Sequence, residues 1–313
     1  MSIMMLPTRD GYGNGLLELG AANPDVLVLD ADLAKSTRSD WFAAKYPERF
    51  FDIGISEQDM IGTAAGLALG GKIPFATTYG VFVAGRAWDQ IRTTVCYSDL
   101  NVKIAGAHGG ISAGGDGATH QALEDIALMR VLPNMKVLVP CDAIEARKAT
   151  VAAGKVFGPC FLRFAREATP VFTEEGDFFE IGIANVLKQG TAATIIAAGP
   201  IVYEALQAHE QLAAEGISLR VINMHTIKPL DEAAVLAAAR ETGAIVTAEE
   251  AQLYGGLGGA VAEVLARKCP TPMEMVGIED SFLECGTPEE LAVKYGLTAK
   301  DLVRAVKKVM ARK

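Results

Sequence analysis

The chain contains a glycine-rich stretch whose flanking side chains could move protons. Residues 108–130 read HGGISAGGDGATHQALEDIALMR, with His108 and His120 on either side of Asp116. Glycine permits positive φ and close approach of the backbone to a ligand. An Asp-Gly turn would by itself explain Asp116. Two histidines and an aspartate around such a loop, directly after an expected strand, nevertheless indicate a ligand site in an open α/β sheet.

A second stretch, GISEQDMIGTAAGLALGG at 54–71, carries a glutamate that could become a buried acid. Ser56 is a candidate N-cap, which puts Glu57 and Asp59 in the first turn of a helix. There both acids could do no more than complement the helix dipole. The residues that follow, 61–71, are almost all small and apolar and would allow close packing. In this second interpretation Glu57 stands at the mouth of a dry site, where desolvation raises the pKa of its carboxyl group.

Alternating apolar runs and amphipathic stretches predict the elements that hold these residues. In the first half the expected strands are 26–30, 72–78, 101–107 and 135–140, and the expected helices are 9–22, 57–69, 83–98 and 142–153. In the second half the expected strands are 191–198, 217–224, 243–250 and 272–278, and the expected helices are 201–214, 231–241, 259–267 and 299–311. This alternation predicts an α/β fold of two consecutive domains, each a mostly parallel sheet flanked by helices.

The acidic stretch REATPVFTEEGDFFEIG at 166–182 interrupts the alternation, because it contains a proline and two glycines and lacks helical periodicity. We therefore expect a first domain at 1–166, a linker at 167–182 and a second domain at 183–313.

The composition excludes several classes of protein. A net charge of −9 argues against a nucleic-acid binder, so an anionic substrate would be held by a local cluster of cations. No apolar run is long enough to span a membrane, and the start MSIMMLPTRD lacks the features of a secretory signal. The five cysteines form no CxxC pair, which indicates reduced thiols and a cytoplasmic location.

Beyond these patterns, residues 52–140 resemble the pyrimidine-binding domain of transketolases and of the related deoxyxylulose phosphate synthases. The resemblance lies in GISEQ, in GGDGATHQ and in the LPNMKVLVP that follows. In the second half, NMHTIKPLDE, VTAEE and GGLGGAVAEVL are similar to the transketolase C-terminal domain. A resemblance over essentially the whole chain implies the C-terminal subunit of a thiamine-diphosphate-dependent enzyme. Such an enzyme transfers two-carbon ketol units between ketose and aldose phosphates.

The resemblance implies roles for residues near the cofactor. Glu57 matches the glutamate that hydrogen-bonds the pyrimidine ring nitrogen and so promotes proton loss from the thiazolium carbon. Tyr79 and Phe82, in TTYGVFVAG, match aromatic residues that wall the pyrimidine, although core packing would also account for them. Asp32, in DADLAKS, matches a cofactor-side acid, with Asp30 close beside it.

The resemblance also implies a substrate channel. Asp116 and His120 match residues that reach the sugar near its reactive carbon, which makes His120 a candidate for proton transfer and for stabilising oxyanion charge. Four residues match the phosphate end of that channel: Arg9, Ser36, His108 and Arg166. Guanidinium, hydroxyl and imidazole groups are good anion ligands. His108 also favours a transketolase, because the synthases have an Asp-Arg pair at that place.

One expected element of the family is missing. Enzymes of this family bind the cofactor's diphosphate through a metal held by Gly-Asp-Gly and a later asparagine. This chain has GDG at 115–117, but residues 140–147 read PCDAIEAR and contain no asparagine. We therefore expect the Mg²⁺ or Ca²⁺ to be held by a partner, an N-terminal transketolase subunit that carries the GDG…N motif. The two chains would share the thiamine diphosphate, as an α₂β₂ heterotetramer, and the second domain here would serve assembly without a catalytic residue.

Three alternatives stay open. The chain could be half of an enzyme similar to deoxyxylulose phosphate synthase, or the beta subunit of a 2-oxo acid dehydrogenase, for which a phosphate-binding set would have no use. It could also be an assembly or regulatory module without catalysis. The presence of Glu57, Phe82, Asp116 and His120 together argues against the last alternative.

Overall fold

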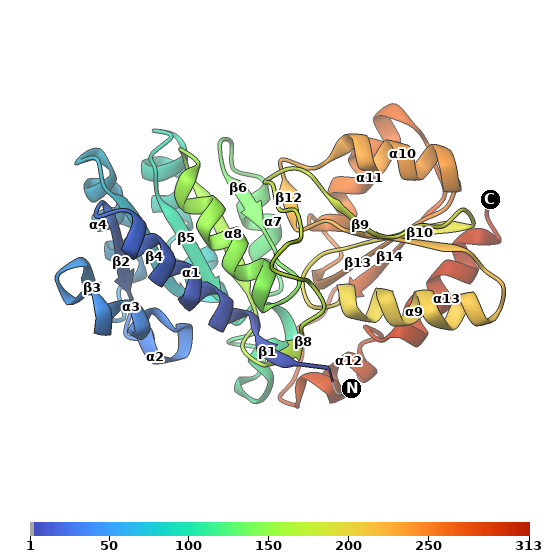
Figure 1. Ribbon diagram of the computed structural model, residues 1–313, viewed down its shortest axis with the longest axis horizontal. Coiled ribbons are helices and arrows are strands. Elements are labelled where there is room, and N and C mark those ends of the chain that lie inside the picture. The colour runs from blue at the N-terminus through green and yellow to red at the C-terminus, as the bar shows by residue number, and fades with distance from the viewer. Residues whose placement is uncertain (1–2) are drawn as a thin grey trace.

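The computed structural model describes residues 3–313, which form two lobes that lie side by side (Figure 1). Each lobe is a sheet between two layers of helices, so the predicted α/β fold with two mostly parallel sheets is confirmed. No helix among the described residues is long and apolar enough to cross a membrane.

The first lobe is built around one large sheet. Its strands are β2 (Val26–Asp30), β3 (Phe50–Asp52), β4 (Ile73–Tyr79), β5 (Lys103–Ala107), β6 (Lys136–Leu138) and β7 (Cys160–Phe164). Its helices are α1 (Thr8–Ala22), α2 (Ala34–Thr37), α3 (Ser39–Lys45), α4 (Glu57–Leu69), α5 (Gly80–Arg86), α6 (Trp88–Gln90), α7 (Asp125–Arg130) and α8 (Ala143–Lys155). A short ribbon pairs β1 (Met5–Pro7) with β8 (Ala168–Pro170), and 3₁₀ turns cover Pro47–Arg49 and Gly110–Asp116.

Alternation along the strands explains how this sheet is buried on both faces. The six strands run parallel in the order β6-β7-β5-β4-β2-β3. In β4, Phe75 packs with α1 and α3, whereas the next residue, Ala76, packs with the apolar cluster of α4 and α5. Successive side chains of a strand point to opposite faces, so near-continuous apolar strands need helices on both sides.

The second lobe repeats this design with a smaller sheet. Its strands are β9 (Asn185–Lys188), β10 (Ala193–Ala197), β11 (Leu219–Asn223), β13 (Ile245–Gln252) and β14 (Met273–Ile278). Its helices are α9 (Val202–Ala214), α10 (Glu232–Thr242), α11 (Leu257–Lys268), α12 (Pro288–Lys294) and α13 (Ala299–Met310). The sheet order is β14-β13-β10-β11-β9, and only β9 is antiparallel to its neighbour among these described strands.

The two lobes share one core, which the division of the sequence did not anticipate. The largest apolar cluster runs from Met60 of α4 through Met129 of α7 to Ile196 of β10. In addition, β12 (Thr226–Lys228), which the sequence analysis placed in the second domain, pairs antiparallel with β6 and extends the first sheet to seven strands. The lobes are therefore held together by packing and by main-chain hydrogen bonds.

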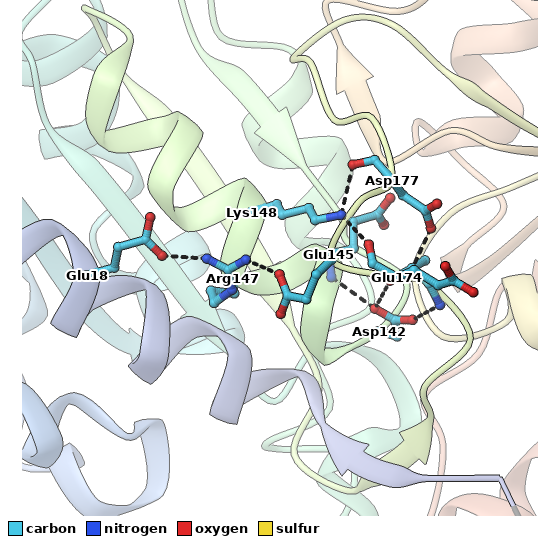
Figure 2. Close-up of polar contacts among 9 residues, drawn as sticks. Glu18, Asp142, Glu145, Arg147, Lys148, Glu174 and Asp177 are labelled. Atoms are coloured by element: carbon cyan, nitrogen blue, oxygen red, sulfur yellow. Dashed lines mark hydrogen bonds and ion pairs between the residues drawn. The ribbon is translucent and has the colours of Figure 1, made fainter.

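The stretch expected to be a linker is fixed against the first lobe. Asp142 caps α8 by accepting the Glu145 N–H, and it also accepts the N–H groups of Phe172 and Thr173. Lys148 donates to the carbonyl oxygens of Glu174 and Asp177 (Figure 2). Helix α8 therefore holds residues 172–177 of the expected linker through both main-chain and side-chain contacts.

Two further differences from expectation lie in the first lobe. The single helix expected at 83–98 begins at Gly80 and divides into α5, α6 and a π-helical turn at Ile91–Cys96. The sequence analysis also missed β7, a fully buried strand between β5 and β6. Its five residues, CFLRF, include an arginine, which interrupts the apolar run.

Candidate functional site

The carboxyl ends of four parallel strands bring the predicted site residues to one edge of the large sheet. The pairing register aligns Asp30 with Thr77, Tyr79 with Ala107, and Ala107 with Phe164. The segments that leave β2, β4, β5 and β7 therefore start side by side, as expected for a ligand site in such a sheet. The start of α1 joins them, because the Ala165 N–H donates to Thr8 Oγ1 over 2.6 Å.

Four aromatic rings form one continuous wall at this edge. Tyr79 and Phe82 stack with an interplanar angle of 13° and ring centroids 5.8 Å apart. Tyr79 also lies 4.0 Å from the His108 ring, and Phe82 lies 5.3 Å from the His120 ring in an edge-on arrangement. The two histidines from the ends of the glycine-rich loop thus converge on the two aromatic residues of the preceding β4 and α5. Flat rings at this spacing suit the binding of a planar heterocycle.

Glu57 is buried at the first position of α4, but it is not an isolated acid. Only 1% of its side chain is exposed, and its Oε2 accepts a hydrogen bond of 2.7 Å from Arg86 Nη1. The expectation of a lone desolvated carboxyl group is therefore corrected, because a cation from α5 compensates the burial. The sequence analysis missed Arg86, although a residue four positions after Phe82 must share its helix face.

His108 is buried, and its ring makes no hydrogen bond to the described residues. Its backbone has φ +59°, its side chain is 1% exposed, and neither ring nitrogen finds a hydrogen-bond partner among the described residues. Burial, reinforced by the guanidinium groups of Arg9 and Arg166, lowers the pKa of His108 to about 3. The imidazole is therefore neutral at pH 7, with one N–H to donate and one nitrogen that accepts.

Arg9 contacts the main chain of Ser36, one of the residues that the resemblance groups with it. Arg9 Nη1 donates to the main-chain carbonyl oxygen of Ser36 over 2.9 Å, and Arg9 Nε is buried without an acceptor among residues 3–313. Burial, and then the nearby charge of Arg38, lower the pKa of Arg9. A cation that is partly desolvated and next to another cation would be stabilised by an anion.

Asp116 and Arg166, which the sequence analysis put at opposite ends of a channel, are in direct contact. Arg166 Nη1 donates to Asp116 Oδ2 over 2.7 Å, and Glu167 lies 3.4 Å from Arg166 Nε. An ion pair therefore bridges the two predicted ends of the channel, next to the turn at Gly117, whose φ is +76°. His120 lies beside the aromatic wall, with Nδ1 at 2.9 Å from Thr119 Oγ1.

The two neighbouring aspartates have different environments. Asp30 is fully buried, and its oxygens accept from the Leu33 N–H and from the hydroxyl groups of Thr37 and Ser39. Burial raises the pKa of Asp30 to about 6. Asp32 is exposed with φ +62°, and its N–H donates to Asp52. Asp30 therefore holds the segment from Leu33 to Ser39 in place. Asp32 is the exposed acid at the same edge of the sheet.

The second lobe supports the glycine-rich loop directly, a contact that the sequence analysis did not anticipate. Gln121 Nε2 donates to the carbonyl oxygen of Glu284 over 3.1 Å. A methyl group on Gly117 would lie 2.7 Å from Cys285 Sγ, so a side chain there would collide with the second lobe. Gln121 follows His120 directly in the sequence, but only the folded chain reveals its partner.

The glycine-rich start of α11 has its own acid and is not an open anion site. Glu249 accepts the N–H groups of Leu257 and Gly258, both over 2.8 Å, and thereby caps the helix. Burial raises the pKa of Glu249 to about 7. This carboxyl group fills the position that a phosphate would take at a helix N-terminus.

The arrangement can bind a planar ring, move a proton and bind an anion within one site. Tyr79 and Phe82 supply the ring surface, and Glu57 Oε1, which accepts no hydrogen bond from residues 3–313, can meet a ring nitrogen. His108 and Arg9 contribute unsatisfied donors for an anion. These features fit the pyrimidine half of thiamine diphosphate, for which this chain would supply the acid and the wall.

The chain is similar to known proteins over nearly its whole length. The family model of the transketolase pyrimidine-binding domain matches residues 4–171, and that of the transketolase C-terminal domain matches residues 182–302. The chain is 44% identical to the 6-deoxy-6-sulfo-D-fructose transketolase subunit SqwH of Clostridium sp. (strain MSTE9), over 97% of this chain and 95% of that one. It is also 44% identical to a putative transketolase C-terminal section of Methanocaldococcus jannaschii, over 97% and 96%.

A solved structure is similar over almost the whole fold. It is described as a split gene transketolase, an inactive beta4 tetramer, and superposes with a TM-score of 0.92 at 50% identity, covering 98% of this chain and 99% of that one. Two domain models in the order found here, relatives of similar length and a shared fold all agree. The chain therefore belongs to the transketolase family and carries its pyrimidine-binding and C-terminal domains.

Proposed function

We propose that this chain is the C-terminal subunit of a transketolase that moves two-carbon ketol units between sugar phosphates, and that it is active only with an N-terminal partner. The observation that carries the proposal is the convergence of Glu57, the Tyr79–Phe82 wall and His120 beside an unsatisfied His108. When bound, thiamine diphosphate supplies the carbon nucleophile that carries the two-carbon unit.

In this proposal, different residues of the chain contact the cofactor, the sugar and its phosphate. Glu57 presents Oε1 to the pyrimidine ring nitrogen and exchanges a proton with it, Tyr79 and Phe82 orient the ring, and Asp32 lies on the cofactor side. His120 exchanges a proton with the sugar and stabilises developing oxyanion charge, while Asp116 binds a hydroxyl group. Arg9, Ser36, His108 and Arg166 bind the phosphate. The last four groups come from four separate segments, and the contact between Arg9 and the Ser36 main chain supports their assignment to one site.

A partner chain completes the proposed enzyme. Within these 313 residues, the asparagine that follows GDG in diphosphate-binding members of the family is missing from 140–147. We propose that an N-terminal subunit supplies GDG…N and the Mg²⁺ or Ca²⁺, in an α₂β₂ heterotetramer located in the cytoplasm. The domain division at 167–182 belongs to the same proposal. A phosphate-binding set favours this function over that of a 2-oxo acid dehydrogenase subunit.

The decisive test is reconstitution. The chain is mixed with an N-terminal transketolase subunit that carries GDG…N, thiamine diphosphate and Mg²⁺, and ketol transfer is assayed across several ketose and aldose phosphates. We expect turnover in the mixture and none with either chain alone. Decarboxylation of a 2-oxo acid by the mixture, without ketol transfer, would instead support the dehydrogenase alternative.

A further inference from the structure

We infer that Arg86 is a positioning residue, which holds the Glu57 carboxylate so that Oε1 alone faces the cofactor. This inference rests on the proposed function of Glu57. It concerns a residue at the end of α5 that touches neither histidine of the site and was not among the predicted site residues.

The geometry couples Arg86 to two parts of the site at once. Its Nη1 lies 2.7 Å from Glu57 Oε2, and its guanidinium carbon lies 4.8 Å from the centre of the Phe82 ring. Stacking of the planar guanidinium on an aromatic face limits its rotation and so fixes the direction of its N–H groups. One side chain therefore ties the acid of α4 to the aromatic wall.

The two partners differ in exposure, so losing one of them is not equivalent to losing the other. The Glu57 side chain is 1% exposed and the Arg86 side chain is 48% exposed. An exposed arginine has water as an alternative partner, whereas the buried carboxylate has only Arg86 among residues 3–313. Removing Arg86 therefore leaves a buried acid without a partner and free to turn about its last torsion. Removing Glu57 leaves a solvated cation, which costs little.

This asymmetry predicts that Arg86 acts only through Glu57. The test is a double-mutant cycle with Glu57→Gln, Arg86→Met and the double variant, each studied in the complex with the N-terminal subunit. Methionine keeps the length and the contact with Phe82 but removes the charge. Arg86→Lys is a conservative rescue, and Arg92→Met is the matched control, since Arg92 is an exposed arginine of the following π-helical turn.

Three quantities are measured. Exchange of the thiazolium C2 proton of bound thiamine diphosphate is followed by NMR, cofactor affinity by calorimetry, and the melting temperature on the isolated chain. Arg86→Met should slow exchange by roughly 10–100-fold, because a misplaced catalytic group loses its orientation. It should leave the cofactor Kd nearly unchanged, and Arg86→Lys should recover part of the exchange rate. The isolated Arg86→Met chain should melt about 2–4 °C lower.

In the Glu57→Gln background, Arg86→Met should change neither the exchange rate nor the melting temperature, because an uncharged amide does not need the cation. Additive losses of exchange rate, or a loss of affinity that persists in this background, would overturn the inference and make Arg86 a structural residue or a direct ligand. If Glu57→Gln itself leaves exchange unchanged, the proposed function fails instead. The two failures are therefore distinguishable.

Discussion

Removing the Arg9 charge should lower kcat/KM for phosphorylated acceptors but not for unphosphorylated ones. The two acids that act electrostatically on Arg9, Asp10 and Glu167, are paired with Arg38 and Arg166 instead. The Arg9 charge is therefore left without a carboxylate partner among residues 3–313 and is free to bind a phosphate. Arg9→Met removes that contact while keeping the length of the side chain.

The magnitude follows from one charge-assisted hydrogen bond, worth about 1.5–3 kcal/mol, so kcat/KM for phosphorylated acceptors should fall by roughly 10–200-fold. The proposed phosphate contact takes no part in bond making, so the loss should lie mainly in KM. Stability should change little, by about 1 kcal/mol or less. Loss of the bond to the Ser36 carbonyl oxygen is offset when the unpaired, partly buried cation is removed.

The assay compares one phosphorylated and one unphosphorylated acceptor in the reconstituted complex. Lys35→Met is the matched control, because Lys35 is an exposed cation directly before Ser36. Arg166→Met should behave differently from Arg9→Met, since it also releases Asp116 from its ion pair and so disturbs both acceptors. Equal losses on both acceptors for Arg9→Met, or a loss of stability of several kcal/mol, would refute the reasoning and make Arg9 a structural residue.

Three further predictions follow from the same site. His120→Ala should lower kcat for both acceptor classes in steady-state assays, because the ring stands where charge develops; a loss confined to KM would contradict this. The pKa of His108, about 3 in the folded chain, lies below its ordinary value of 6.5, so its protonation opposes folding as pH falls below 6.5. Relative to His108→Asn, the wild-type chain should lose about 1.6 kcal/mol of stability between pH 6.5 and 5 in denaturant titrations, and parallel pH profiles would be the contrary result. Gln121→Ala, which removes the hydrogen bond to the Glu284 carbonyl oxygen, should reduce kcat more than the melting temperature, whereas the exposed Gln58→Ala should not. Unchanged kcat in Gln121→Ala would show that the second lobe does not support the loop.

Local patterns were enough to predict the fold, the helix that carries Glu57 and the glycine-rich loop with His108, Asp116 and His120. The other predicted site residues came only from the resemblance to transketolases. The apolar strands β2, β4 and β5 and the helix that begins at Glu57 are specified by nearby residues, and parallel strands bring their carboxyl ends together by geometry. The glycine-rich loop was recognisable because its composition is needed for positive φ, which Gly110, Gly114 and Gly117 adopt.

Contacts between distant segments were not predictable from such patterns. The ion pair between Arg86 and Glu57 depends on how α5 packs against α4. The pairing of β12 with β6 depends on the docking of the two lobes, and the contact between Asp116 and Arg166 on the path of a loop. Each of these features depends on how distant segments are placed relative to one another, and the spacing of apolar residues along the sequence does not encode that placement.

The central claim is that this chain holds one part of a cofactor site that a partner completes. Calorimetric titration of thiamine diphosphate with Mg²⁺ into the isolated chain, into the N-terminal subunit and into their mixture tests it most directly. We predict weak binding to each chain alone, tight binding in the mixture, and C2 proton exchange in the mixture that is lost in Glu57→Gln. Tight binding and turnover by the isolated chain, or exchange that does not depend on Glu57, would contradict the account.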